Sequence, residues 1–402
     1  SDNKSKVFST AFISLLVTTV LFLLVVLIFN QTVADFVHLK QTYFNLLIGV
    51  LVLDTLVVIP FAYLRATGRP IRFTAIKLSN IAIYVVLNFF FLWAIPKYGI
   101  AFPYYDSTDL VKYIFIANLA ASIFTLIIVS PYFFKVKWRF STSIFRQLLS
   151  YGWPIMVAGL AYVINENFDK WLLPEMLGKE INGAYSGCYK IAVFMTIFIQ
   201  AFRLGAEPFF FNHSKEKNAK QTYATIMKYF VIFGSAMLVF IVAYLDLFKE
   251  LLVKDKSYWI AIDIVPIVLL ANLFLGIYFN LAIWYKLTDK THYGMYLSIV
   301  GALVTIAFNY VMIPEIGFMA SAWATLAAYG IMMVLSYILG QKHYKVPYNI
   351  KRILAYLLLA ILCSVLVLQT HLNYAVNTVF VLLFFGIVLL SEKKEIKQLL
   401  KR

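Results

Sequence analysis

Charged side chains inside apolar segments are the residues of this sequence best suited to chemistry. Five of them occur in the middle of the chain: Asp169, Lys170, Lys190, Arg203 and Glu207. A charge at the centre of a membrane costs about 2.5–3.5 kcal/mol on insertion scales, so it indicates function by default. The alternative is that these residues form structural ion pairs, or lie near the interface and extend toward water.

Two pairs of opposite charges have the four-residue spacing of one helical face. Glu166 lies about one turn before Lys170, and Arg203 lies one turn before Glu207. Side chains four residues apart on a helix can meet. We therefore predict that each pair can form a contact. The acids Glu166, Asp169 and Glu207 could also bind a proton or a sodium ion.

A further acid and a basic turn precede these residues. Asp54 lies mid-segment before Pro60, where its alternative role is a hydrogen bond to backbone freed by the proline. The basic turn consists of Arg65, Arg69, Arg72 and Lys77. Topology alone also predicts a basic cluster of this kind, because cytoplasmic loops are rich in Lys and Arg.

The segments that carry these residues are long and apolar. Of the 402 residues, 62% are hydrophobic and 13% are charged, whereas soluble domains are about 45–50% apolar and about 25% charged. No aqueous fold could bury this much apolar surface, so we predict an all-α integral membrane protein. Its expected transmembrane helices, about twelve in number, are 7–29, 43–64, 77–96, 110–133, 150–174, 184–211, 225–248, 260–285, 293–314, 317–340, 352–370 and 373–391.

The loops between these segments differ in charge on the two sides. The formal net charge of +16 fits the positive-inside bias and attraction to anionic lipids, and not nucleic acid. One set of loops is strongly basic and includes Lys135, Lys137 and the tail from Lys393 to Arg402, while the other set carries few cations. We therefore expect both termini on the cytoplasmic side. All loops are short, so function is expected within the membrane.

Two stretches of the chain, 65–99 and 286–317, resemble each other. Four pairs of matching residues are separated by the same number of positions: Arg65 with Lys286, Thr67 with Thr288, Arg69 with Lys290 and Asn88 with Asn309. After a short deletion in the second stretch, two further pairs match: Pro96 with Pro314 and Gly99 with Gly317. Both copies begin on the same side, which indicates two parallel halves with a site between them, a common transporter plan. The paired asparagines are expected to hydrogen-bond between helices. The alternative is a chance likeness between apolar helices.

Four longer stretches resemble one family. They read IPFAYLRATGRPIRFTAIKLSN at 59–80, NFDKWLLPEMLGKEINGAYSGCYKIA at 167–192, FRLGAEPFFF at 202–211 and NYVMIPEIGFMASAWAT at 309–325. Together they resemble the polysaccharide-export and O-antigen flippase branch of the multidrug/oligosaccharidyl-lipid/polysaccharide (MOP) flippase superfamily. The likeness covers essentially the whole chain and rests on the order and spacing of these stretches.

The resemblance implies a fourteen-span plan with two six-helix lobes and two trailing helices. Because we count about twelve spans, and the chain begins with Ser1, the expected missing pair would precede residue 1. On this plan residues 1–146 hold the last four spans of the first lobe. Residues 147–346 form the second lobe, and 347–402 form the trailing pair and a basic cytoplasmic tail.

The resemblance also implies a function. A flippase of this family moves an undecaprenyl-pyrophosphate-linked oligosaccharide across the bacterial inner membrane by alternating access around a cationic cavity, for O-antigen, lipopolysaccharide or other polysaccharide synthesis. Arginine binds pyrophosphate bidentately and lysine binds it as a point charge. The expected substrate-binding residues are Arg203, Lys170, Lys190, Lys77, Arg65, Arg69 and Arg72. The expected ion-coupling residues are Glu207, Asp169, Glu166 and Asp54.

Two other functions stay open. A MATE-like drug antiporter of the same superfamily would favour an acidic cavity, whereas the internal charge here is more basic. A membrane-embedded glycan polymerase or transferase would need catalytic groups on large outer loops, and the early ones carry only Asp35, Asp106 and Asp109.

The sequence has no Walker A pattern and no arrangement typical of paired acid/base catalysis or a metal site. We therefore expect a protein that is not an enzyme and has no cofactor, with proton or sodium coupling as one driving force open to it. Its expected partners are the lipid-linked oligosaccharide, anionic lipids and other polysaccharide-assembly membrane proteins.

Overall fold

The computed structural model of the chain describes residues 2–103, 105–134, 138–370 and 374–399. Lys135, Lys137 and the end of the basic tail, residues 400–402, lie outside the described residues. Within the described ranges the chain forms helices and connecting turns, with no β-strand. Twelve helices are long and apolar enough to cross a membrane. The prediction of an all-α membrane protein with about twelve spans is therefore confirmed.

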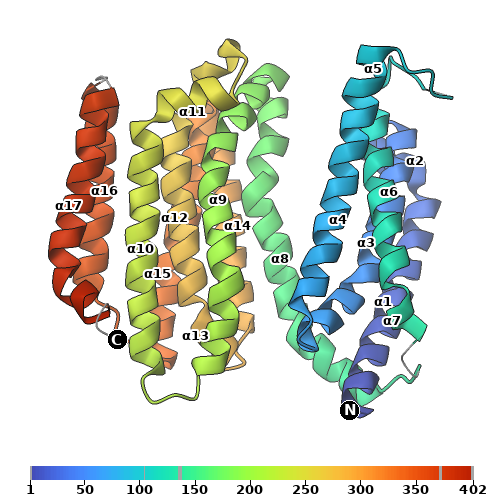
Figure 1. The fold of residues 1–402 in the computed structure, drawn as a ribbon, viewed down its shortest axis with the longest axis horizontal. Helices are drawn as coiled ribbons and strands as arrows, with labels where there is room; N and C mark the ends of the chain where they lie inside the picture. Colours follow the sequence, from blue (N-terminus) through green and yellow to red (C-terminus); the bar gives the residue numbers. More distant parts are fainter. Residues whose placement is uncertain (1, 104, 135–137, 371–373, 400–402) are drawn as a thin grey trace. The chain divides into compact units, whose positions relative to one another are not determined.

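The chain divides into two compact units, Ser1–Ser150 and Tyr151–Arg402, called unit 1 and unit 2 below. The helices of unit 1 are α1 (Asp2–Ile28), α2 (Asn30–Phe36), α3 (Gln41–Ala66), α4 (Pro70–Phe89), the π-helical turn η1 (Phe90–Ala94), α5 (Ile95–Tyr98), α6 (Val111–Val129), α7 (Pro131–Phe134) and the start of α8 (Thr142–Leu177). The helices of unit 2 are the rest of α8, α9 (Lys179–His213), α10 (Ala219–Ala243), α11 (Leu245–Leu252), the 3-10 turn η2 (Lys256–Ala261), α12 (Ile264–Leu281), α13 (Ile283–Leu287), α14 (His292–Ile316), α15 (Met319–His343), α16 (Ile350–Thr370) and α17 (Tyr374–Leu399) (Figure 1).

Two spans are longer than their apolar runs predicted. The run 150–174 lies within α8, which covers Thr142–Leu177, and the run 184–211 lies within α9, which covers Lys179–His213. An apolar run marks only the part of a helix that lipid must surround. The backbone hydrogen bonds of a helix continue through the polar residues at its ends.

In unit 1, α6 packs against both α3 and α4. Ser122 Oγ of α6 donates a hydrogen bond to Asp54 Oδ1 of α3 at 2.7 Å. Asn80 Nδ2 of α4 donates to the Ala121 carbonyl at 3.0 Å. Asp54 thus bonds to a neighbouring helix, and not to the backbone near Pro60 that was its alternative partner. Bonds of this kind hold helices together in lipid.

The loop between α5 and α6 holds two of the acidic residues considered above for catalysis. Asp106 Oδ1 accepts hydrogen bonds from the hydroxyl and the amide of Thr108, at 2.6 and 2.9 Å, and these bonds hold the pKa of Asp106 below its ordinary value. Asp109 accepts a hydrogen bond from the Tyr43 hydroxyl and lies 3.7 Å from Lys40 Nζ. Both carboxylates therefore have structural partners.

Close packing characterises the centre of unit 2, where α10 meets α12. A Cβ added to Gly234 of α10 would lie 2.4 Å from Leu273 Cδ1 of α12, and one added to Gly276 of α12 would lie 2.4 Å from Phe230 Cζ of α10. Each helix therefore accepts a large side chain of the other over a glycine. Small residues permit this close approach between membrane helices.

The last two helices, α16 and α17, pack against each other and against α10 (Figure 1). A buried ion network joins the three. Lys228 Nζ of α10 donates to Glu392 Oε2 at 2.6 Å and also to Glu395, both on α17. Arg352 Nη1 of α16 donates to Glu395 Oε1 at 2.9 Å, and the Tyr356 hydroxyl donates to Glu392. Lys228 is 5% exposed and Glu392 is 1% exposed, so loss of either partner would leave a buried charge unpaired.

The internal repeat also exists in the backbone. Gly68 and Asp289, which share one position of the repeat, both adopt positive φ, 72° and 55°. Beside them, the Arg69 amide donates to the Leu64 carbonyl at 3.0 Å, and the Lys290 amide donates to the Tyr285 carbonyl at 2.8 Å. Both copies therefore end one helix with the same left-handed turn. The correspondence between the two stretches is confirmed at these turns.

The second part of the repeat differs between the copies. Asn88 and Asn309 each donate to the carbonyl four residues earlier, both at 2.8 Å. Only the Asn309 side chain has a described bond to another helix, since it accepts from the Ser321 hydroxyl of α15 at 2.6 Å. Pro96 follows Asn88 by eight positions, whereas Pro314 follows Asn309 by five. The extra residues of the first copy coincide with η1, and π-helical turns are the form that such insertions take inside helices.

Candidate functional site

A polar cavity of about 490 Å³ lies within unit 2. Its lining residues come from α8, α9, α12, α13, α14 and α15 and from the turn before α14. Among them are Arg203 and Glu207, which the sequence predicted as site residues, and Lys286, which it did not. These three side chains are the charged groups of the cavity lining.

The three charged side chains form one cluster. Arg203 Nε and Nη2 donate to Glu207 Oε1, both at 3.3 Å. Lys286 Nζ donates to the same oxygen at 2.7 Å. Two cations thus share one carboxylate, which leaves one positive charge in excess. The contact predicted between Arg203 and Glu207 is confirmed.

The helices place these groups by simple geometry. Arg203 and Glu207 lie four residues apart on α9, so they share one face. Lys286 can contact Glu207 because α12 ends at Leu281 and the chain continues in the short helix α13. Lys286 lies in the last turn of α13. The guanidinium of Arg203 also lies 3.9 Å from the ring centroid of Phe279, a cation–π contact that orients it. The side chains are 36% exposed for Arg203, 35% for Glu207 and 25% for Lys286, so the cluster is accessible from the cavity.

Hydroxyl and aromatic groups form much of the remaining wall. The hydroxyls of Tyr278 and Tyr285 lie 3.3 Å apart. A Cβ at Gly294 would lie 2.9 Å from the Tyr285 ring, so a small residue is needed there. The other polar or aromatic lining residues are Tyr151, Tyr162, Thr196, Gln200, Phe211, Phe279, Thr291 and Ser298. The cavity can therefore hydrogen-bond a polar guest and stack against it.

The acids of α8 form a second, buried cluster that is not part of the cavity lining. The Tyr185 hydroxyl donates to Asp169 Oδ2 at 2.6 Å, and Asp169 is 3% exposed. Lys170 Nζ lies 4.0 Å from Asp169 Oδ1 and 4.3 Å from the ring centroid of Tyr189. Asp169 and Lys170 are thus neighbours of each other and are packed against tyrosines of α9.

Glu166 and Lys170 do not meet through their charged groups as their spacing suggested. The Lys170 ammonium donates to the backbone carbonyl of Glu166. The Glu166 carboxylate instead accepts a hydrogen bond from the Tyr329 hydroxyl of α15. A helical spacing of four permits a pair, but a closer partner on another helix takes the carboxylate here.

The other predicted site residues lie apart from the cavity lining. Lys190 is exposed on α9. The basic turn belongs to unit 1, where three of its cations lie over aromatic rings: Arg65 over Phe73 at 5.3 Å, Arg72 over Tyr132 at 5.5 Å and Lys77 over Phe61 at 4.9 Å. Arg69 is exposed. Asp54 of the same unit bonds to Ser122, as described above.

Lys286 is the functional candidate that sequence reasoning missed. The sequence predicts a loop position for it, because it directly follows the predicted span 260–285. One signal could have identified it: it occupies the repeat position of Arg65, which was itself a predicted site residue. Its partner on α9 is 79 positions away in the sequence, so no local spacing pointed to the pair.

Comparisons with known proteins identify the family and the fold of the chain. Residues 1–256 match the family model described as polysaccharide biosynthesis protein. The chain belongs to this family. Among proteins with curated functions, none matches it.

Several solved structures share its fold. The lipid II flippase MurJ, in an inward closed conformation, has a TM-score of 0.71 at 15% identity, over 98% of this chain and 86% of that one. An outward-facing multidrug resistance MATE family transporter of the MOP superfamily has a TM-score of 0.68 at 14% identity, over 88% and 80%. A MOP superfamily transporter from Pyrococcus furiosus, described as having a binding pocket of reverse polarity, has a TM-score of 0.68 at 13% identity, over 88% and 79%.

At these identities the likeness is one of fold, and the fold is that of the MOP superfamily. The chain is thus a member of the polysaccharide biosynthesis protein family with twelve candidate membrane spans in its described residues, and it shares its fold with these membrane transporters.

Proposed function

We propose that this protein flips an undecaprenyl-pyrophosphate-linked oligosaccharide across the bacterial inner membrane, with both termini in the cytoplasm. The observation that carries the proposal is the cluster in which Arg203 and Lys286 share the Glu207 carboxylate inside a polar cavity. Its excess positive charge suits an anionic substrate and disfavours the cationic drugs of an antiporter. The product would then pass to other membrane proteins of polysaccharide assembly.

Glu207 acts in this proposal as an internal counter-ion. In the absence of substrate, its carboxylate satisfies both cations, which avoids leaving charges unpaired in a membrane protein. A pyrophosphate carries more negative charge and more acceptor oxygens than one carboxylate. It can therefore compete for Arg203 through paired hydrogen bonds and for Lys286 as a point charge.

The rest of the lining supports a glycan as the attached group. Tyrosine, threonine and serine hydroxyls offer both donors and acceptors, which match the hydroxyls of sugars. The rings of Tyr162 and Phe279 add flat apolar surfaces. A polar head can thus be solvated by the protein while the lipid tail stays in the bilayer.

Coupling to an ion gradient is assigned in this proposal to the buried acids of α8. Asp169 and Glu166 are each held by a tyrosine hydroxyl, and ionisable groups buried in spans often serve as proton or ion relays. Glu207 and Asp54 are the further coupling candidates. One charge moved across 100 mV supplies about 2.3 kcal/mol.

The test is flipping of a fluorescent undecaprenyl-pyrophosphate glycan in liposomes that contain the full-length protein. We expect Arg203→Ala to reduce the rate about 10- to 100-fold, because one charge-assisted hydrogen-bonding group contributes about 1.5–3 kcal/mol. Lys179→Ala, on the same helix but outside the cavity, is the matched control and should keep the wild-type rate.

Two results would contradict the proposal. If the wild-type protein moves no glycan lipid with or without an ion gradient but expels cationic drugs, it is an antiporter. If it extends or transfers the glycan instead of moving it, it is a polymerase or transferase.

A further inference from the structure

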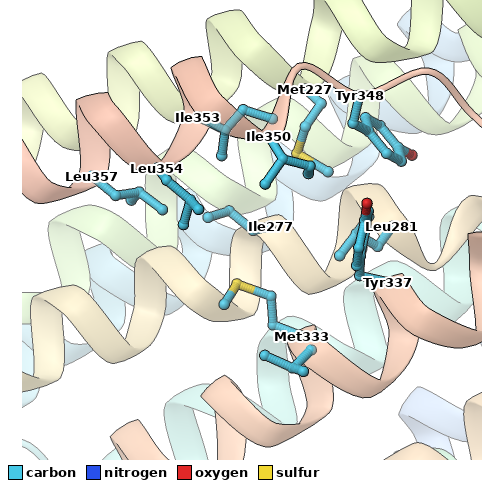
Figure 2. A pocket seen from close by; sticks show the side chains of 11 residues that line it. Met227, Ile277, Leu281, Met333, Tyr337, Tyr348, Ile350, Ile353, Leu354 and Leu357 are labelled. Atoms are coloured by element: carbon cyan, nitrogen blue, oxygen red, sulfur yellow. The ribbon is translucent and has the colours of Figure 1, made fainter.

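A second cavity of unit 2 has a chemistry opposite to that of the substrate site. It has a volume of about 150 Å³ and lies among α10, α12, α15, the segment before α16, and α16. Figure 2 shows its side chains, which are aliphatic or Met except for two tyrosines. An apolar cavity of this size does not hold water and takes up hydrocarbon guests.

The cavity is open toward the surroundings of the helices. Met227, Ile277 and Leu357 of its inner wall are buried, whereas Val334 of α15 and Leu354 of α16 are 50% and 51% exposed. These exposed residues lie on spans, where the surrounding solvent is lipid. Hydrocarbon from a lipid chain is therefore the guest that can reach the cavity.

Two tyrosines lie at one end of the cavity. The rings of Tyr337 and Tyr348 lie 6.3 Å apart, and Figure 2 shows both hydroxyls at the same end. Tyr348 belongs to the short segment between α15 and α16. The cavity surface itself is apolar, and the two tyrosines mark its end near the segment that connects α15 to α16.

Two cations are close in the sequence to lining residues of this end. Lys345 lies three residues before Tyr348, and Lys351 directly follows Ile350, another lining residue. Both lysines are exposed, and within the described ranges neither has an ion-pair partner. Arg352, by contrast, is paired with Glu392 and Glu395. The two lysines are therefore free to hold an anionic headgroup.

We propose that this cavity binds part of one acyl chain of an anionic phospholipid, whose headgroup lies on Lys345 and Lys351. The lipid would fill the space between α16 and the α12–α15 pair, where α16 lacks the direct packing that it has with α10. This inference does not depend on the proposed function, because it concerns a resident lipid and not the transported one.

The test is phospholipid binding to the delipidated full-length protein, measured by native mass spectrometry. Dioleoyl phosphatidylglycerol and dioleoyl phosphatidylcholine have the same chains and differ in headgroup charge. We expect the wild type to prefer phosphatidylglycerol. The double variant Lys345→Gln/Lys351→Gln should lose that preference by about fivefold for each lysine removed. The variant Lys254→Gln/Lys256→Gln, between the end of α11 and the first residue of η2, should keep it.

A second variant tests the chain site itself. Leu354→Trp would fill the cavity and should weaken binding of both phospholipids about tenfold, which corresponds to about two displaced methylene groups. Leu358→Trp is the matched control, since Leu358 lies one turn further along α16, is 64% exposed and does not line the cavity. Val334→Trp repeats the test from the opposite wall if Leu354→Trp does not fold.

Three outcomes would overturn the proposal. One is equal affinity of the wild type for the two phospholipids. Another is equal binding by the Leu354→Trp and Leu358→Trp variants. The third is displacement of phosphatidylglycerol by a polyprenyl phosphate of higher affinity, which would assign the cavity to the transported lipid.

Discussion

The basic turn of unit 1 and its counterpart in unit 2 have the same backbone but different side-chain partners. In unit 2, Lys286 donates to the Glu207 carboxylate at 2.7 Å. In unit 1 the matching residue, Arg65, is exposed and lies 5.3 Å from the Phe73 ring centroid. The turn itself is therefore a structural device that joins two helices. A cation on this turn has a role in the site only in unit 2, where Lys286 contacts a carboxylate and lines the cavity.

The largest expected difference between the turns is in transport. Lys286→Met should lower glycan-lipid flipping about 10- to 100-fold, because it removes a charged ligand of about 1.5–3 kcal/mol. Arg65→Met at the matching position should lower it no more than about fivefold, since an exposed cation–π contact contributes only about 0.5–1 kcal/mol. Both rates would be measured in liposomes with equal amounts of folded protein. If both variants lost the same fraction of the flipping rate, the position of Lys286 in the cavity would have no special effect on transport.

A smaller effect should appear in anion binding when the shared carboxylate is neutralised. Glu207→Gln leaves Arg203 and Lys286 without their counter-ion, so inorganic pyrophosphate should bind about five- to tenfold more tightly, equivalent to about 1–1.4 kcal/mol. Isothermal titration of the purified protein measures this change. Glu180→Gln, at the other end of α9, is the control and should leave the affinity unchanged. Weaker binding to the Glu207→Gln variant would mean that Glu207 orients the cations and does not compete with the substrate.

The smallest expected effect concerns the backbone of the turns. Asp289 holds a positive φ that glycine adopts without strain, so Asp289→Gly should raise the free energy of unfolding by up to about 1 kcal/mol. Gly68→Ala at the matching position should lower it by about 1–2 kcal/mol, because a Cβ is disfavoured in this conformation. Thermal unfolding in detergent gives both values. A change of the same sign in the two variants would contradict the equivalence of the turns.

The sequence predicted what depends on neighbouring residues along the chain. Hydropathy located all twelve spans, because each must be apolar over the thickness of a bilayer. The contact between Arg203 and Glu207 followed from their spacing on one helix. The left-handed turns lie where the repeat aligned a glycine with an aspartate, two of the residue types that tolerate positive φ.

Partners far apart in the sequence could not be predicted in this way. Glu166 bonds to Tyr329, which is 163 positions away, and Asp54 bonds to Ser122, which is 68 positions away. Such pairs depend on which helices lie next to each other and on how far one helix is shifted along its axis relative to the other. Spacing alone therefore suggested Lys170 as the partner of Glu166, whereas the structure brings the Tyr329 hydroxyl of α15 to this carboxylate.

The ion network around Lys228 has a consequence for the order of synthesis. Its partner Glu392 follows 164 positions later in the chain. At a synthesis rate of about 5–20 residues per second, Lys228 therefore waits roughly 10–30 s for that carboxylate. During this interval α10 carries an unpaired charge that must reach toward water or lipid headgroups. A chain that ends before Glu392 keeps that charge unpaired permanently, and we expect it to accumulate in the membrane at a lower level than the full-length protein.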